Sequence, residues 1–143
     1  MDYSGVARAF RKELEKLHGL GALPEHFKDF PKACCGAVSV LLGDYLIKQF
    51  DLRAMYVEGM RDGKPHGWIE IDGIVIDITG DQFEGRPSVF TAAKDSWYDS
   101  WAERSRRPAE HLIECQVDVE EREVLRAVLS GATLPDPYKK KKL

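Results

Sequence analysis

The feature that most constrains the fold is a pair of β-forming runs separated by two residues. HGWIEI (66–71) and IVIDIT (74–79) flank Asp72-Gly73, a dipeptide that favours a type I′ turn and hence a tight hairpin. Side chains alternate between the two faces of a strand, and Ile71 lies opposite Ile74. One face of the ribbon is therefore apolar and should face the core: Ile69, Ile71, Ile74, Ile76 and Ile78. A one-residue slip would turn half of this set outward, so the register is well specified.

The opposite face of the same hairpin carries polar and aromatic side chains. It presents His66, Trp68, Asp77 and Thr79, with His66 and Asp77 as diagonal neighbours on adjacent strands. Such positions lie roughly 7–8 Å apart at the backbone, within reach of long side chains. An aspartate in contact with an imidazole fixes its tautomer and stabilises its charged form. One interpretation is a solvent-facing ribbon with an incidental pair. The other is a functional pair, for which the position of Asp77 speaks, because aspartate is disfavoured inside a strand.

Two adjacent cysteines, Cys34 and Cys35, begin a helical pattern that runs to about Phe50. Adjacent cysteines do not readily bridge, and the chain has three cysteines, so no disulfide scaffold is expected. A helix N-terminus lowers the pKa of a thiol through its dipole and free amides, and the same amides can hold an oxyanion. A cysteine there, with a histidine and an aspartate on neighbouring strands, fits a nucleophile, base and orienter.

The remaining periodicities predict an α+β protein. Apolar residues at three- and four-residue steps predict a helix over 3–18, and alternation predicts a strand over 53–60 before the hairpin. Further expected elements are a short strand at 88–90, a helix at 94–107, a strand at 111–117 that contains Cys115, and a helix opened by Asp118 and closed by Gly131. We expect one domain, 1–134, and a basic tail, 135–143.

Composition and charge exclude several classes of protein. The formal net charge of −3 gives no electrostatic case for nucleic acid, and no apolar run reaches the roughly 18 residues of a membrane span. The charged N-terminal stretch lacks the apolar core of a secretory signal, so a cytoplasmic location is expected. Zinc is the main rival use of cysteine and histidine. CC lacks the gap of a CxxC knuckle and the histidines at 18, 26, 66 and 111 are scattered, so no metal site or cofactor is expected.

Two segments together resemble a known family. CCGAVSVLL and YVEGMRDGKPHGWIEIDGIVIDITGDQF are similar to the core of the transglutaminase-like branch of the papain-like cysteine enzyme superfamily. The similarity covers roughly residues 30–83, with Cys35 at the start of a helix, His66 in HGW and Asp77 in IDIT. It implies a Cys-His-Asp triad and a papain-like, transglutaminase-like core whose cysteine-bearing central helix packs on an antiparallel sheet.

Cys35 fits the family pattern better than Cys34. Four residues after Cys35 lies Ser39, small enough to let the histidine approach, whereas Cys34 is followed at that step by Val38. We expect Cys34 to line the site or to be a buried neighbour. Trp68 and Gln82 are further candidates for lining the site. The alternatives stay open that Trp68 simply covers the sheet and that Gln82 is an ordinary loop residue. The chain departs from the family in lacking a glutamine upstream of the cysteine to serve as oxyanion donor.

The resemblance implies a cysteine peptidase or amidase, or an acyltransferase, that acts on a protein or peptide through a thioester. Two alternatives stay open: a non-catalytic binding module on the same fold, and an intracellular metal-binding regulator. The oligomeric state and the particular substrate are not indicated by any residue pattern.

Overall fold

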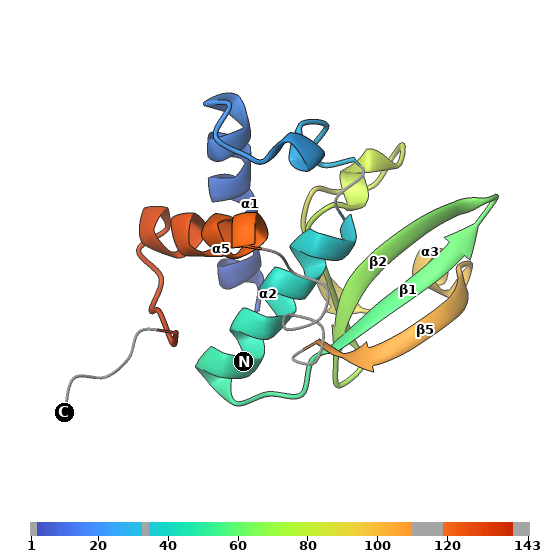
Figure 1. Ribbon diagram of the computed structural model, residues 1–143. Coiled ribbons are helices and arrows are strands. Elements are labelled where there is room, and N and C mark those ends of the chain that lie inside the picture. Colours follow the sequence, from blue (N-terminus) through green and yellow to red (C-terminus); the bar gives the residue numbers. More distant parts are fainter. Residues whose placement is uncertain (1–2, 33–34, 110–118, 139–143) are drawn as a thin grey trace.

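The computed structural model describes residues 3–32, 35–109 and 119–138. Within these ranges the chain is mixed α+β, with a five-stranded antiparallel sheet in the order β4-β3-β2-β1-β5. Figure 1 shows α2 lying across one side of the sheet, with α1 and α5 beyond it. The α-helices are α1 (Ser4–Gly19), α2 (Cys35–Phe50), α3 (Ser96–Asp99) and α5 (Val119–Gly131). The strands are β1 (Met55–Arg61), β2 (Lys64–Ile71), β3 (Ile74–Asp77), β4 (Phe90–Ala93) and β5 (Ala102–Pro108), and two 3₁₀ turns are η1 (Glu25–Phe27) and η2 (Gly80–Gln82).

The predicted hairpin register is confirmed. Ile69 pairs with Ile76, and Ile71 pairs with Ile74 across β2 and β3. The connecting Asp72 and Gly73 have φ values of 49° and 80°, as a type I′ turn requires at both central positions. The Asp72-Gly73 turn therefore helps to set the register of the hairpin. The register in turn determines which side chains face α2 and which lie on the opposite face.

Two hydrophobic clusters lie on the two faces of the sheet. The larger one contains the isoleucine face of the hairpin together with the buried side of α2 and residues of α1 and α5. The smaller one lies on the opposite face and is built from Val57, Trp68 and Val75 of the strands with Tyr98 and Trp101 from α3 and just after it. This second cluster excludes the solvent-facing interpretation of the hairpin's polar face, because that face is covered.

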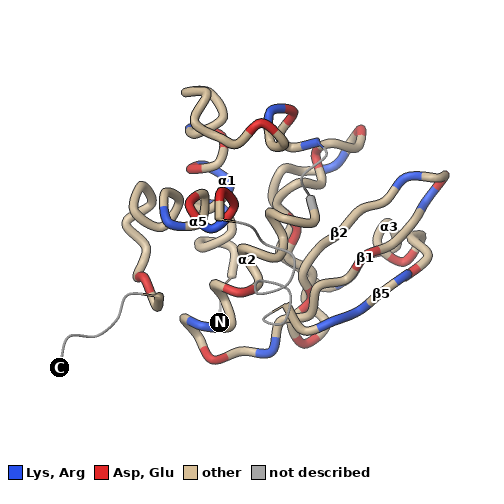
Figure 2. The backbone as a smooth tube through the Cα atoms, in the orientation of Figure 1, with Lys and Arg blue, Asp and Glu red and all other residues tan. Residues whose placement is uncertain are grey.

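The predicted helix at 94–107 is wrong beyond Asp99. Only α3, Ser96–Asp99, is helical, and the chain continues as β5, an edge strand paired with β1. After Trp101 the segment has no apolar stripe that would favour a helix. Its backbone instead forms hydrogen bonds with β1, and this pairing outweighs the local helical preference. Figure 2 shows basic residues along β5, and its exposed arginines are the kind of side chain that protects an edge strand from further pairing.

Other boundaries were close to those predicted. The short strand expected at 88–90 overlaps β4, Phe90–Ala93, at Phe90 alone, and β4 pairs with β3. The expected strand at 111–117 with Cys115, and the cap at Asp118, lie outside the described residues. The first residues of the predicted tail contact α2, because Tyr45 donates a hydrogen bond to Pro135 O and Tyr138 donates one to Asp44. In the described parts of the chain, no helix is both long and apolar enough to cross a membrane.

Gly43 tests how closely α2 packs on the sheet. A Cβ at this position would lie 2.6 Å from Ile69 Cδ1 and 2.8 Å from Ala109 Cβ. We expect Gly43→Val to lower the free energy of unfolding by about 1–3 kcal/mol, the usual cost of overpacking. Gly5→Val is the matched control, since no atom lies within 4 Å of a Cβ there, and it should change that free energy by less than about 0.5 kcal/mol. Urea titrations that give equal losses for the two variants would contradict this packing.

Candidate functional site

A buried histidine and a buried aspartate form the centre of the site. His66 Nε2 lies 2.7 Å from Asp77 Oδ2, so the contact predicted from the hairpin register is confirmed. The two side chains are on neighbouring strands of the sheet, on the face opposite α2. His66 is 0% exposed and Asp77 is 1% exposed. A carboxylate this deeply buried must be fully hydrogen bonded, because desolvation of an unpaired charge is costly.

The carboxylate of Asp77 meets that requirement with both of its oxygens. Oδ1 accepts a hydrogen bond from the backbone N–H of Thr79 at 3.0 Å and lies 3.5 Å from the hydroxyl of the same residue. Oδ2 accepts from His66 and also from the Tyr98 hydroxyl at 2.8 Å. Burial, and then the charge of Asp77, raise the pKa of Tyr98 above its ordinary value, so the phenol remains a donor.

The second ring nitrogen of His66 faces a predicted lining residue. Gln82 Nε2 lies 3.3 Å from His66 Nδ1 and donates to Thr79 O at 3.0 Å. An amide N–H that points at Nδ1 fits an unprotonated Nδ1, with the ring proton on Nε2 and directed at Asp77. In that tautomer, Nδ1 of the neutral ring is the nitrogen that can accept a proton.

The short turn η2 that carries Gln82 is anchored from α1. Arg11 donates through both terminal nitrogens to Asp81, each at 2.7 Å, and to Ile78 O at 2.8 Å. Burial disfavours the guanidinium charge, but the hydrogen bonds to Asp81 and Glu15 outweigh it and raise the pKa of Arg11. This bidentate pair ties the loop after β3 to the rest of the fold and thereby places Gln82 beside the imidazole.

Two contacts join α2 to β2 at Gly67, the residue that follows His66. Ser39 is buried and donates a hydrogen bond to Gly67 O at 3.2 Å, which places the helix against the residue after His66. The Tyr56 hydroxyl lies close to the points where Gly36 and Gly67 would each carry a Cβ. The helix begins at Cys35 as predicted, while the side chain of Cys35 and all of Cys34 lie outside the described residues.

Aromatic rings surround the imidazole of His66. Trp68, a predicted lining residue, is buried with its ring centroid 5.6 Å from that of His66, and its Nε1 donates to Glu70 at 2.9 Å. Three more rings lie at similar distances of 5.1, 6.0 and 5.6 Å: Phe83, Trp97 and Trp101. This aromatic shell keeps water from the His66–Asp77 pair and so strengthens the electrostatic interaction between them.

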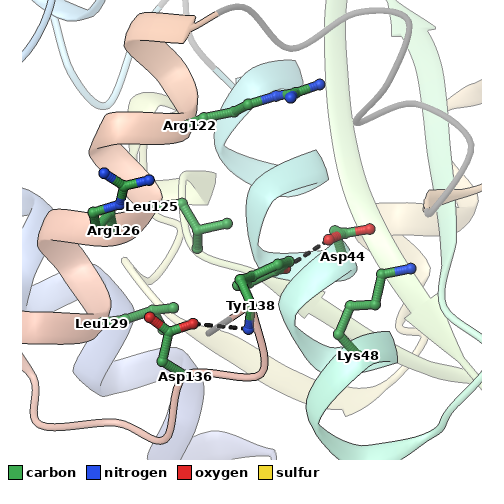
Figure 3. A pocket seen from close by; sticks show the side chains of 8 residues that line it. All are labelled: Asp44, Lys48, Arg122, Leu125, Arg126, Leu129, Asp136 and Tyr138. Carbon is green, nitrogen blue, oxygen red and sulfur yellow. Dashed lines mark hydrogen bonds between the residues drawn. The ribbon is translucent and has the colours of Figure 1, made fainter. Parts of the chain in front are cut away.

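A separate cavity of about 310 Å³ lies between α2 and α5 (Figure 3). Asp136 and Tyr138 border it, and Tyr138 reaches across to Asp44, whose Oδ2 accepts a hydrogen bond from the Tyr138 hydroxyl at 2.6 Å. Basic side chains from both helices also line it, among them Lys48 and Arg126. None of its lining residues belongs to the His66 site. Over the described ranges, no group of three His, Cys, Asp or Glu side chains is placed to hold a metal ion.

Comparisons with known proteins found no counterpart: no protein-family model matches the chain, and no curated protein or solved structure matches it either. The geometry of the site must therefore carry the functional argument.

Sequence reasoning did not identify Tyr98, Arg11 or Asp81 as parts of this site. Tyr98 lies in SWYDSW, a segment dense in aromatic residues, and Asp95 before it is the N-cap of α3 and accepts from Tyr98 N at 3.1 Å. The capping signal was readable in the sequence, but nothing local shows that α3 lies over β3. Arg11 and Asp81 are 70 residues apart, so their pairing is a tertiary fact that no local pattern reveals.

The anchor between Arg11 and Asp81 can be tested directly. Asp81→Asn keeps the shape but removes the charge, and we expect a loss of about 1–2 kcal/mol in the free energy of unfolding, the lower part of the range for hydrogen bonds to charged groups. The value is low because the side chain of Asp81 is 28% exposed.

Glu15→Gln is the matched control, because Glu15 contacts the same guanidinium from a position that is 54% exposed. It should cost less than about 0.5 kcal/mol, as exposed i,i+4 pairs do. If chemical denaturation gives both variants the same loss, Asp81 is not the anchor of this loop.

Proposed function

We propose that this protein is a cysteine-dependent hydrolase or acyltransferase whose nucleophile, base and orienting group are Cys35, His66 and Asp77. The observation that supports the proposal is the buried hydrogen bond between His66 Nε2 and Asp77 Oδ2, in a strand whose next residue, Gly67, accepts a hydrogen bond from Ser39 of α2. We further propose that α2 and the antiparallel sheet constitute a transglutaminase-like core of the papain-like type. The cysteine-bearing helix on an antiparallel sheet, and the order of the three residues along the chain, support this assignment.

The proposed reaction begins with a proton transfer. His66 Nδ1 takes the proton of the Cys35 thiol, and Asp77 stabilises the resulting imidazolium through Nε2–H. The thiolate adds to the carbonyl carbon of an amide, and backbone N–H groups at the start of α2 stabilise the oxyanion. The imidazolium then gives its proton to the leaving nitrogen as the C–N bond breaks, which leaves a thioester on Cys35.

A second nucleophile releases the acyl group. Water attacks the thioester in peptidase or amidase chemistry, and a primary amine attacks it in acyl transfer. In both cases His66 accepts the proton of the nucleophile and returns it to the departing thiolate, so that the starting state is restored. We take hydrolysis of a protein or peptide amide as the first reaction to test. A cytoplasmic location, where the three cysteines would stay reduced, belongs to the same proposal.

A non-catalytic binding module on the same fold is the second candidate. The observation that favours it is the complete burial of His66, since a histidine whose neighbours are all protein groups can be purely structural. The two candidates differ in one property that needs no substrate, namely the state of the Cys35 thiol near neutral pH.

The pH dependence of alkylation separates the two candidates. An ordinary thiol with a pKa of about 8.5 loses reactivity roughly tenfold for each pH unit below that value. A Cys35 thiolate paired with the His66 imidazolium should instead react with iodoacetamide at a rate that changes by less than about threefold between pH 5.5 and 7.5. Rates are followed by mass spectrometry of the peptide that contains residues 34 and 35.

Matched variants show which cysteine gives the pH-independent alkylation. Cys35→Ser should abolish the pH-independent alkylation, whereas Cys34→Ser and Cys115→Ser should leave it intact. His66→Asn should restore the steep dependence of an ordinary thiol. A wild-type protein in which every cysteine shows the steep dependence would refute the enzymatic proposal and leave the binding module.

A further inference from the structure

The carboxylate oxygen that holds His66 also holds a tyrosine. Asp77 Oδ2 lies 2.7 Å from His66 Nε2 and 2.8 Å from the Tyr98 hydroxyl. The two donors come from different parts of the chain, one from β2 and one from α3, and meet at a single acceptor atom. Because the other oxygen is already bonded to the Thr79 backbone, the carboxylate is restrained on every side.

Tyr98 is held firmly enough to act as a fixed donor. It is 1% exposed, and its backbone N–H is capped by Asp95. Asp95 is paired with Arg86 at 3.1 Å, and the Arg86 guanidinium lies 5.3 Å from the centre of the Tyr98 ring. The ring also packs edge-on against Trp68 at 5.1 Å. The backbone and ring of Tyr98 are therefore held by contacts that involve neither His66 nor Asp77, and its hydroxyl reaches the carboxylate from that fixed position.

We propose that Tyr98 is a positioning residue that orients the Asp77 carboxylate and draws off part of its negative charge, so that His66 is bound less strongly as an imidazolium than it would be by Asp77 alone. A hydrogen-bond donor on a carboxylate oxygen spreads the charge of that oxygen and weakens its attraction for a second donor. A base that gives its proton to the leaving nitrogen must not be held too strongly in its charged form. This role rests on the proposed function, but its physical content can be measured without any activity.

Several groups could influence the charge on His66. Among the described residues it meets Asp77 from β3, the neutral amide of Gln82 from η2, and aromatic rings from β2 and the segment 83–101. Arg86 lies 5.3 Å from the centre of the Tyr98 ring and acts on the Tyr98 phenol, whose pKa it lowers against the larger, raising effect of burial. The thiol of Cys35 is the remaining titratable group that the proposed function places next to the ring, so the test removes it.

The experiment measures the pH at which His66 gains its second proton, by NMR of the imidazole, in a Cys35→Ser background. The chain has four histidines, and the signal of His66 is assigned by its loss in His66→Asn. Tyr98→Phe should move this midpoint upward by about half a pH unit or more, because Asp77 Oδ2 then serves His66 alone.

Tyr45→Phe is the matched control. It removes the hydroxyl of an equally buried tyrosine, one that donates to Pro135 O at 2.9 Å, and should leave the His66 midpoint unchanged. A residue with a merely structural role would lower stability without moving the midpoint. An unchanged or lower midpoint in Tyr98→Phe would therefore overturn the proposal.

A second substitution keeps the test decisive if Tyr98→Phe does not fold. Site-specific replacement of Tyr98 by 3-fluorotyrosine preserves the shape and makes the phenol a more acidic, stronger donor. The His66 midpoint should then fall, and an unchanged or higher midpoint would overturn the proposal. These titrations are done in protein without the Cys35 thiol. The proposed role of Tyr98 can therefore be refuted while Cys35 alkylation supports the proposed function, and the reverse outcome is equally possible, so the two proposals are tested separately.

Discussion

The register between β2 and β3 is the constraint on which the rest of the structure depends. Pairing Ile69 with Ile76 sends the isoleucines toward α2 and sends His66 and Asp77 to the opposite face. A shift of one residue would expose apolar side chains and separate the histidine from its carboxylate. The energetics of the core and the geometry of the candidate site are thus set by the same backbone hydrogen bonds, and the Asp72-Gly73 turn helps to fix them.

Burial of the His66–Asp77 pair requires compensation from several segments. Thr79 N–H and the Tyr98 hydroxyl satisfy the carboxylate, Gln82 faces the other side of the imidazole, and aromatic rings exclude water. If the pair were exposed to solvent, it would need fewer compensating hydrogen bonds. The attraction between the imidazole and the carboxylate would also be weaker, because water screens it. A buried and hydrogen-bonded pair holds its imidazole in one orientation, which the proposed thiol-dependent reaction requires of its base.

Strong local signals predicted the framework of the fold. The hairpin, α1 and α2 follow from period and turn chemistry, and the contact between His66 and Asp77 follows from strand alternation. The prediction failed for the segment after α3, where β5 forms by pairing with β1, a long-range contact that no local pattern contains. The same limit hid Tyr98 and the Arg11–Asp81 anchor, since each depends on how distant segments are packed together. That Cys35, His66 and Asp77 act together in catalysis remains a prediction.

The central claim is that His66 and the Cys35 sulfur share one proton, and the protonation state of the His66 ring at pH 7 tests it most directly. If a thiolate lies against Nδ1, ring nitrogen chemical shifts should show a charged imidazolium in the wild-type protein and a neutral ring in Cys35→Ser, because removing the thiolate removes the negative charge that holds the second proton. Identical ring states in the two proteins would contradict the account, since they would show that the sulfur and the imidazole do not interact.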